Sequence, residues 1–283
     1  MIKLLNWLSE NPIKTIIIST IYFLSTLLLH VQVGNLFKIL YEIFTFEAFS
    51  IYIIIVSIIL SLLLLLYLTK HIINHEFKLR TILYIVLTSL LLILGFDLLI
   101  SYNVELIHYP QYAILFILVF PLNKKFVETI IICSLLSIID ELYQFISIAD
   151  ARYLDFNDFV LNSIGTLSGA VIVYIITGYK KTEHTLKSRD YNLRKFITSR
   201  PLIIAVALLI VCIISFSVNI LGYWADDNAL YNINKELFHN RPFWHTKPGG
   251  GQWHVLYPRE GTIILYLLPL IYLGMDIIKP DKK

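Results

Sequence analysis

Charged residues and cysteines are scarce in this chain. Asp, Glu, Lys and Arg make up 15% of its 283 residues, against 57% hydrophobic residues, and the mean hydropathy is +0.73. This composition excludes an ordinary soluble domain. The two cysteines, Cys133 and Cys212, lie inside apolar runs, where a small thiol packs well, so we expect no disulfide.

Signatures of several enzyme classes are also missing. The chain has no Gly-x-Ser-x-Gly, no Walker loop, no dinucleotide-binding glycine pattern and no Asp-Asp-x-x-Asp pair. These absences argue against a serine hydrolase, a nucleotide-driven pump and a prenyl-diphosphate enzyme. We therefore expect no nucleotide as a partner.

Long apolar runs are what the chain does contain. Each covers about 17 to 23 residues, which is enough to cross a hydrocarbon core of about 30 Å as a helix. The runs predict an all-α fold, a polytopic integral membrane helical bundle of about eight transmembrane helices. The first run lacks a signal-peptide cleavage pattern, so we expect it to remain as an anchor. The predicted helices are 13–33, 48–69, 81–100, 105–121, 126–148, 157–179, 201–223 and 262–278.

Positive charges predict the orientation, because cytoplasmic loops retain Lys and Arg. If the amino terminus is cytoplasmic, inner segments hold 17 of the 23 Lys and Arg residues, including seven between positions 180 and 200. Eight spans then place both termini of a multi-pass cell-membrane protein in the cytoplasm. The net charge of +3 follows mostly from this bias, so it indicates contact with membrane lipids and no nucleic-acid partner.

The chain divides into three zones. Residues 1–80 hold two plain apolar N-terminal helices, which suit a scaffold. Residues 81–180 hold the polar residues described below, and residues 181–283 hold two C-terminal helices that flank an extracytoplasmic loop, 224–261. The loop is rich in Trp, His and Gly. Its aromatic residues suit either the membrane interface or stacking on sugars, and we predict that the loop covers the mouth of the polar site.

Polar side chains concentrate in the central zone. An ionisable group inside a bilayer costs about 2.5 to 3.5 kcal/mol on insertion scales, so several together indicate a use. They occur in three predicted helices, and all lie toward the outward ends of those helices. Together they predict an outward-facing polar pocket. Its residues are Glu105, His108 and Tyr112, then Asp140, Glu141 and Gln144, then Arg152, Asp155, Asp158 and Asn162.

The spacing of these residues places them on shared helix faces. Glu105, His108 and Tyr112 follow an i, i+3, i+7 pattern, and Asp155, Asp158 and Asn162 repeat it. Asp140 and Gln144 are four residues apart, so they point inward together. The pair Gly165 and Gly169 continues the last stripe and lets a neighbouring helix approach closely.

Arg152 is the cation nearest to these acids on the outward side. Its guanidinium either clamps a phosphate or carboxylate of a ligand, or neutralises Asp155 or Asp158. Both alternatives stay open at this stage.

The polar motifs resemble those of the VanZ-like family, which is named for a protein associated with teicoplanin resistance. The resemblance covers about residues 104–173 and implies an integral membrane protein of the cell envelope. Gln111 departs from the acidic residue often found before the tyrosine. The resemblance is carried by Glu105-Leu-Ile-His-Tyr-Pro-Gln-Tyr112, by Asp140-Glu-Leu-Tyr-Gln144, and by Arg152, Asp158, Asn162, Gly165 and Gly169.

Three hypotheses follow for the polar pocket. In the first, it modifies a lipid-linked or cell-surface glycan substrate, or another cell-wall precursor, at the outer face, with glycopeptide tolerance as a consequence. Imidazole and carboxyl groups suit acid–base transfer, and amide, phenol and guanidinium groups suit substrate binding. The expected catalytic residues are Glu105, His108, Asp140, Glu141 and Asp158, and the expected substrate-binding residues are Tyr112, Gln144, Arg152, Asp155 and Asn162.

The second hypothesis is a divalent metal site, because histidine and carboxylates suit Mg, Mn or Zn. No His-Glu-x-x-His or Cys-x-x-Cys motif supports it, so we expect no cofactor. The third hypothesis is a non-catalytic binding or transport protein in which the polar residues form a hydrogen-bonded network that holds the helices together. The sequence leaves open whether the protein is an enzyme.

Overall fold

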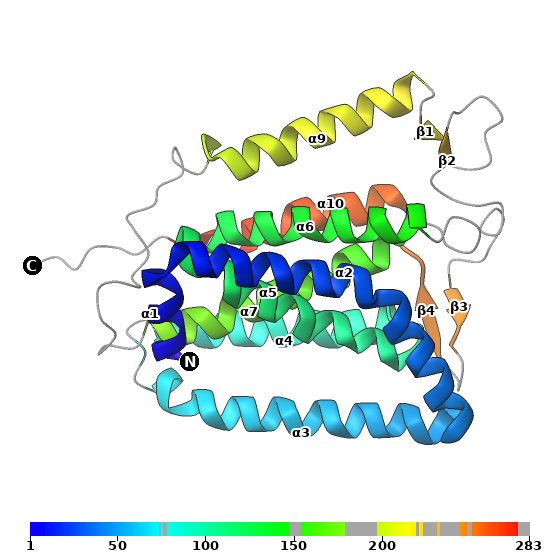
Figure 1. The fold of residues 1–283 in the computed structure, drawn as a ribbon, viewed down its shortest axis with the longest axis horizontal. Helices are drawn as coiled ribbons and strands as arrows, with labels where there is room; N and C mark the ends of the chain where they lie inside the picture. Colours follow the sequence, from blue (N-terminus) through cyan, green and yellow to red (C-terminus); the bar gives the residue numbers. More distant parts are fainter. Residues whose placement is uncertain are drawn as a thin grey trace, which may run out of the picture.

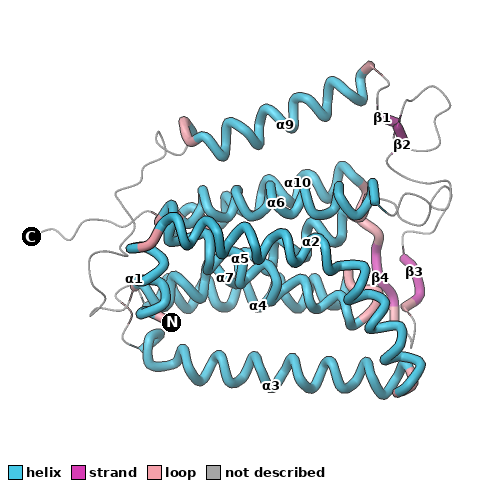
Figure 2. Tube along the Cα trace, in the orientation of Figure 1, coloured by secondary structure: helices cyan, strands magenta, loops and turns pink. Residues whose placement is uncertain are grey.

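The computed structural model describes residues 1–73, 75, 78–147, 154–178, 197–218, 221–222, 231–232, 244–247 and 251–276. Within these residues the chain forms a bundle of helices with short strands at one end (Figures 1 and 2). The elements are α1 (Ile2–Glu10), α2 (Pro12–Ile43), α3 (Phe46–Ile73), α4 (Lys78–Leu98), η1 (Asn103–Ile107), α5 (His108–Asn123), α6 (Phe126–Ser147), α7 (Phe156–Thr177), α9 (Arg200–Ser217), β1 (Leu221–Gly222), β2 (Tyr231–Asn232), β3 (Trp244–Thr246), β4 (Gln252–His254), α10 (Pro258–Ile271) and η4 (Leu273–Met275).

The prediction of an all-α polytopic membrane bundle is confirmed. In the described part of the chain, six helical segments are long and apolar enough to cross a membrane. They comprise α2, α3, α4, η1 with α5, α6 and α7. Helices α9 and α10 occupy the other two predicted positions; α9 has a shorter apolar stretch, Arg200–Ser215, and α10 has 14 residues. The total of eight crossings stays a prediction.

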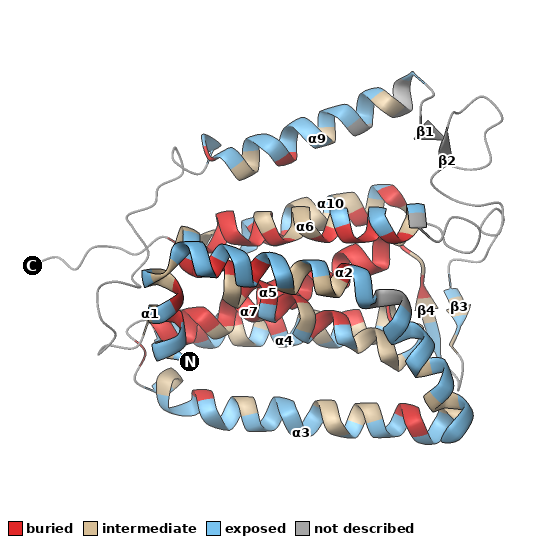
Figure 3. Ribbon diagram, in the orientation of Figure 1, coloured by how far each residue is buried: buried red, intermediate tan, exposed pale blue. Residues whose placement is uncertain are grey.

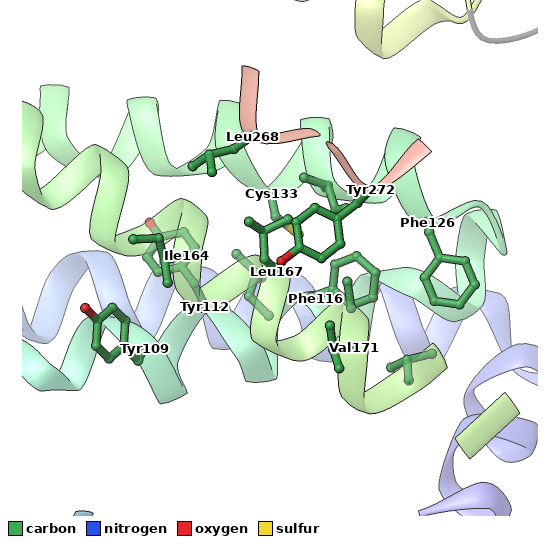
Figure 4. Packing of buried hydrophobic residues seen from close by; sticks show 14 of the residues in the cluster. Tyr109, Tyr112, Phe116, Phe126, Cys133, Ile164, Leu167, Val171, Leu268 and Tyr272 are labelled. Atoms are coloured by element: carbon green, nitrogen blue, oxygen red, sulfur yellow. The ribbon is translucent and has the colours of Figure 1, made fainter. Parts of the chain in front are cut away.

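Helix α7 forms the centre of the bundle. Of its apolar stretch, 89% is buried, whereas the corresponding value for α3 is 6%. Helices α4, α5, α6 and α10 pack around α7, and α2 packs on α5. Buried aromatic and aliphatic side chains fill the space between them, including Tyr112, Phe116, Leu167 and Tyr272 (Figure 4). Burial of this surface orders the helices that carry the polar residues.

The outer faces of the bundle are apolar and exposed (Figure 3). Leu66 and Leu79, for example, are 70% and 83% exposed. A soluble protein would bury such side chains, but the hydrocarbon of a membrane accepts them. Helices suit this setting because every backbone amide in their interior is bonded within the segment. The chain is therefore a membrane protein.

Successive membrane-length helices alternate in direction (Figure 1). One end of the bundle, which we call the η1 end, holds η1, the start of α7, the end of α4 and the strands. The opposite end, the α1 end, holds α1 and the start of α6. There Asp276, from beyond η4, accepts hydrogen bonds from the amides of Phe126 at 2.8 Å and Val127 at 2.9 Å. These bonds satisfy two donors at the start of α6.

Several predicted boundaries were wrong. Helix α2 runs on to Ile43 because its last turns pack on α3 through Phe37 and Tyr41. The reversal falls at Thr45, which adopts a positive φ of 47°. The sequence analysis predicted neither α1 nor the strands. Helix α10 ends earlier than predicted and is followed by the turn η4, which contains Gly274, while residues 277 and 278 lie outside the described residues.

Candidate functional site

Two glycines bring α5 and α7 into backbone contact. A Cβ atom at Gly165 would lie 2.7 Å from the carbonyl oxygens of His108 and Tyr109, and one at Gly169 would lie 2.5 Å from the carbonyl oxygen of Ala113. Neither position has room for a side chain. The predicted close approach at this pair is therefore confirmed, and it sets the first turn of α5 against α7.

His108, the first residue of α5, is held by α7. Its Nδ1 lies 2.8 Å from Oδ1 of Asn162, and its Nε2 lies 3.3 Å from Oδ1 of Asp158. All three side chains are buried. The i, i+4 spacing of Asp158 and Asn162 places both groups on the face of α7 that meets the imidazole.

The orientation of the Asn162 amide follows from its partners. Its Nδ2 donates to Oγ of Ser137 at 2.9 Å and to Oε1 of Glu141 at 3.3 Å. A carboxylate oxygen accepts hydrogen bonds, so the amide nitrogen faces Glu141 and the amide oxygen faces His108. Nδ1 of His108 therefore carries a hydrogen. The other ring nitrogen, Nε2, lies beside Asp158.

Behind this pair lies a layer of hydrogen-bonded side chains. Tyr112 donates to Oδ2 of Asp140 at 2.9 Å, and Gln144 donates to Oδ1 of Asp140 at 3.1 Å and to Oε1 of Glu141 at 3.4 Å. Together with the bonds of Asn162 to Ser137 and Glu141, these bonds link α5, α6 and α7. The predicted joint inward position of Asp140 and Gln144 is confirmed. We call this layer the inner network; all its members are buried, and they are Tyr112, Ser137, Asp140, Glu141, Gln144 and Asn162.

Glu105 and Asp155 organise the backbone at the η1 end. Glu105 accepts from the amide of Ser101 at 2.9 Å and from its hydroxyl at 2.7 Å, and so fixes the turn that leads into η1. Asp155 is the N-cap of α7 and accepts from the amide of Asn157 at 2.9 Å. The partners described above for the His108 ring come from α7.

A cavity of about 520 Å³ lies between α2, the η1–α5 segment and the start of α7. This volume falls in the range of small-molecule sites, about 300 to 1,000 Å³. His108 and Asp158 border the cavity, and so do Glu105 and Asp155. Leu29 and Ile107 on its two sides are 51% and 44% exposed, so the cavity opens toward the lipid-facing surface of the bundle.

The cavity has a polar end and an apolar wall. The polar residues are those at the start of α5 and α7. The wall is a stripe of α2 in which Leu29, Val33 and Phe37 are apolar, with Gly34 beside them. Ser25 and Thr26 line the cavity nearer to Tyr22, and the hydroxyl of Thr26 donates to the carbonyl oxygen of Phe23 at 2.7 Å within the same helix. The hydroxyl of Tyr22, which also lines the cavity, donates to the carbonyl oxygen of Gln111 at 2.9 Å. The site therefore suits a molecule that has both a polar and a hydrocarbon part.

Three features of this site escaped the sequence analysis. Ser137 looks like one more small residue of an apolar helix, and the α2 wall lies in a zone assigned to scaffold. Asn157 bonds the carbonyl oxygens of Leu99 at 2.9 Å and His254 at 2.8 Å, and its Oδ1 accepts from an amide of the β4–α10 segment at 2.8 Å. The sequence did contain one signal for the α2 wall, because five of its residues share one face of a helix. They are Tyr22, Thr26, Leu29, Val33 and Phe37.

The hairpin β3–β4 is the best described part of the 224–261 loop. It docks on the end of α4, where Nζ of Lys247 donates to the carbonyl oxygens of Phe96 at 3.2 Å and Asp97 at 2.7 Å. Burial lowers the pKa of Lys247, and the nearby carboxylates of Asp97 and Glu105 oppose that shift. The described cavity lining comes from other segments.

Some predicted residues cannot be placed. Arg152 lies outside the described residues, as do parts of the 224–261 loop. Whether Arg152 meets a ligand or the acids of α7 therefore stays a prediction. Among the described residues, no three His, Cys, Asp or Glu side chains are grouped so that they could hold a metal ion.

Comparison with known proteins agrees with the motifs. No curated protein and no solved structure matches the chain. Residues 100–177 match the VanZ/LLP1 family model, over the segment that contains His108, the inner network and Asp158. The resemblance predicted from the sequence is thereby confirmed, and this membrane protein contains a VanZ-like segment.

Proposed function

We propose that this protein binds and modifies a lipid-linked or cell-surface glycan component of the cell envelope, with His108 and Asp158 as its proton-transfer groups. One observation carries the proposal: Nε2 of His108 and Oδ1 of Asp158 lie 3.3 Å apart on the wall of a cavity that also has an apolar side. A histidine can exchange protons near neutral pH, and an adjacent carboxylate stabilises its protonated form.

The chemical step needs a hydroxyl group as nucleophile, supplied by water or by an acceptor molecule. Nε2 of His108 takes the hydroxyl proton while the oxygen forms a bond to an acyl, glycosyl or phosphoryl centre of the substrate. The bond from that centre to its leaving oxygen breaks, and Nε2 returns the proton to this oxygen. Asp158 stabilises the ring while it is positively charged, and Asn162 keeps Nδ1 protonated throughout.

The remaining polar residues take supporting roles in this proposal. Glu105 and Asp155 border the cavity, and carboxylate oxygens can accept hydrogen bonds from sugar hydroxyls. The inner network holds Asn162 in the orientation that His108 requires. Arg152 remains a candidate to bind an anionic group of the substrate.

We also propose that the η1 end faces the cell exterior. The alternation of helices puts Lys70, Lys78, Lys124 and Lys125 at the α1 end, and cytoplasmic ends retain such charges. The cavity would then meet envelope components from the outer side of the cell membrane. Glycopeptide tolerance would follow if the modified product binds teicoplanin less well.

A non-catalytic role is the second candidate, and the inner network favours it. Its members are fully packed and bonded across α5, α6 and α7, as expected of groups that hold helices together. Under this alternative the protein binds or moves its ligand without chemistry. Replacement of His108 would then change the amount of protein or ligand bound, but no product would be missing.

The test compares envelope lipids and cell-wall fragments by mass spectrometry. Cells would carry the wild-type protein, no protein, or His108→Gln at matched membrane levels, and teicoplanin susceptibility would be measured in parallel. We expect one product to be missing in both the deletion and the variant. A wild-type product profile in folded His108→Gln would reject the catalytic proposal and leave the binding role.

A further inference from the structure

We propose that the stripe of α2 along the cavity binds a single hydrocarbon chain of the substrate, which reaches it from the bilayer between α2 and α5. The inference deepens the function proposed above and rests on it for the identity of the reacting headgroup. It assigns a ligand class to this site: an amphiphile with a chain and a hydroxyl-rich head.

The α2 stripe is long enough to contact a lipid chain. The lining residues of α2 extend from Tyr22 to Phe37, about 22 Å along a helix at 1.5 Å per residue. This length exceeds half of a hydrocarbon core of about 30 Å. A lipid chain with its head at the η1 end would therefore lie along most of the stripe.

The cavity adjoins the lipid-facing surface of the bundle. Leu29 and Val33 on α2 and Ile114 on α5 line it, and they are 51%, 37% and 44% exposed. The same residues belong to the lipid-facing surface of the bundle, so the cavity is continuous with the region where lipid chains lie. A chain can leave the bilayer for the cavity without crossing water.

The two ends of the cavity differ in their side chains. Glu105, Asp155 and Asp158 border it at the η1 end, and carboxylate oxygens accept hydrogen bonds from hydroxyl groups. At the other end of the α2 stripe, the hydroxyl of Tyr22 donates to the carbonyl oxygen of Gln111. The complementary ligand therefore has donors at one end and hydrocarbon at the other, and it meets Nε2 of His108 with its head.

Gly34 offers a specific way to fill the site. It lines the cavity, and a Cβ atom added there would have no heavy atom within 4 Å. The Cβ of a larger residue therefore meets no neighbouring segment, and the rest of the side chain is expected to extend into the cavity. Helix α2 also gains from the change, because glycine in a helix interior is less stable than alanine by about 0.5 to 1 kcal/mol.

The experiment uses the full-length protein in phosphatidylglycerol vesicles with a photoreactive probe. The probe is a dodecyl glucoside with a diazirine in the middle of its chain, and the labelled residues are mapped by mass spectrometry. We expect labelling at Leu29, Val33 and Ile114 to exceed that at Leu28, which is 54% exposed and lies on the opposite face of α2. Unlabelled dodecyl glucoside should compete, and dodecanol should compete less.

Two cavity-filling variants and one control sharpen the result. Gly34→Trp and Val33→Phe should each lower labelling of Ile114, by about tenfold for the tryptophan, since a ligand cannot share the volume of a side chain. Leu28→Trp places a tryptophan on the opposite face of α2 and should leave labelling of Ile114 unchanged. Equal labelling at Leu28 and Ile114, or full labelling of Ile114 in both filled variants, would overturn the proposal.

His108→Gln separates this inference from the proposed function. We expect this variant to keep labelling in the cavity while it loses the product. If Gly34→Trp keeps full product formation, the chain site is wrong and the proposed chemistry stands. If His108→Gln keeps full product formation while Gly34→Trp loses both product and labelling, the chemistry is wrong and the chain site stands.

Discussion

The inner network and the His108–Asp158 pair belong to one hydrogen-bonded system but meet different surroundings. Asp140 is fully enclosed and bonds Tyr112 and Gln144, whereas His108 and Asp158 border a cavity of about 520 Å³. Asn162 connects the two by bonding both the imidazole and Glu141. The difference shows that neighbouring polar residues can have separate roles. The inner network holds the helices together, and the His108–Asp158 pair is placed to meet a ligand.

The largest expected effect is at Asp158, on the cavity side. Asp158→Asn keeps the size of the side chain but cannot stabilise a protonated His108. We expect product formation to fall by about a hundredfold, the lower range of what acid–base catalysis contributes. The measurement is product per folded protein, and unchanged product in this variant would place the proton transfer elsewhere.

A large effect on stability is expected in the inner network. Asp140→Ala removes the acceptor of the Tyr112 hydroxyl and one of the acceptors of the Gln144 amide. Loss of a buried charged partner lowers the free energy of unfolding by about 3 kcal/mol. Unfolding in detergent should show this loss. Asp140→Asn keeps an acceptor oxygen and should stay folded, with product per folded protein close to wild type. If well-folded Asp140→Asn formed no product, Asp140 would take part in the reaction itself.

The close contact of α5 and α7 links the two regions. Gly165→Ala would force its Cβ against the carbonyl oxygens of His108 and Tyr109, so we expect a loss of about 1 to 3 kcal/mol in unfolding free energy. The shift of His108 should lower product formation as well. Gly34→Ala serves as the control, because its Cβ enters open space. Equal effects at the two glycines would contradict the packing argument.

A smaller effect is expected at the hairpin. Lys247→Met removes the bonds to the end of α4, so proteolysis within the β3–β4 hairpin should become faster. Because the pKa of Lys247 is lowered in the folded protein, the unfolded chain binds more protons at alkaline pH. Wild-type stability should therefore rise relative to the variant as pH approaches the ordinary lysine pKa. No difference in either measurement would show that the contact is weak.

The smallest effect is expected from metal removal. Among the described residues, no three His, Cys, Asp or Glu side chains are grouped as metal ligands, and the bonds of Glu105, Asp140 and His108 described above go to hydroxyl, amide, carboxylate and backbone groups. We therefore expect a chelator to leave product formation unchanged. Loss of activity that Mg²⁺, Mn²⁺ or Zn²⁺ restores would revive the metal hypothesis from the sequence.

Much of the fold could be predicted because lipid imposes simple rules. Long apolar runs must be helices in a membrane, so the helices that carry the site were found from composition and length. Their ends were less predictable. Helix α2 continues past its apolar run to contact α3, and a positive φ at Thr45 then reverses the chain; both depend on tertiary contacts.

The candidate site was predictable within each helix but not between helices. Spacing showed that Asp140 pairs with Gln144 and that Asp158 and Asn162 share a face. It could not show that His108 bonds Asn162 and Asp158, because that depends on the approach of α5 to α7. The cavity wall on α2 was missed for the same reason, since apolar residues that face lipid and apolar residues that face a cavity look alike in sequence.

The most direct test of the account asks whether the cavity is reached from outside the cell. Val104 lines the cavity at the η1 end, so Val104→Cys would be treated with a membrane-impermeant maleimide in intact cells, in a chain whose two native cysteines are alanine. We predict labelling without permeabilisation and protection by dodecyl glucoside. Labelling that appears only after the cells are opened would contradict an outward-facing site for an envelope substrate.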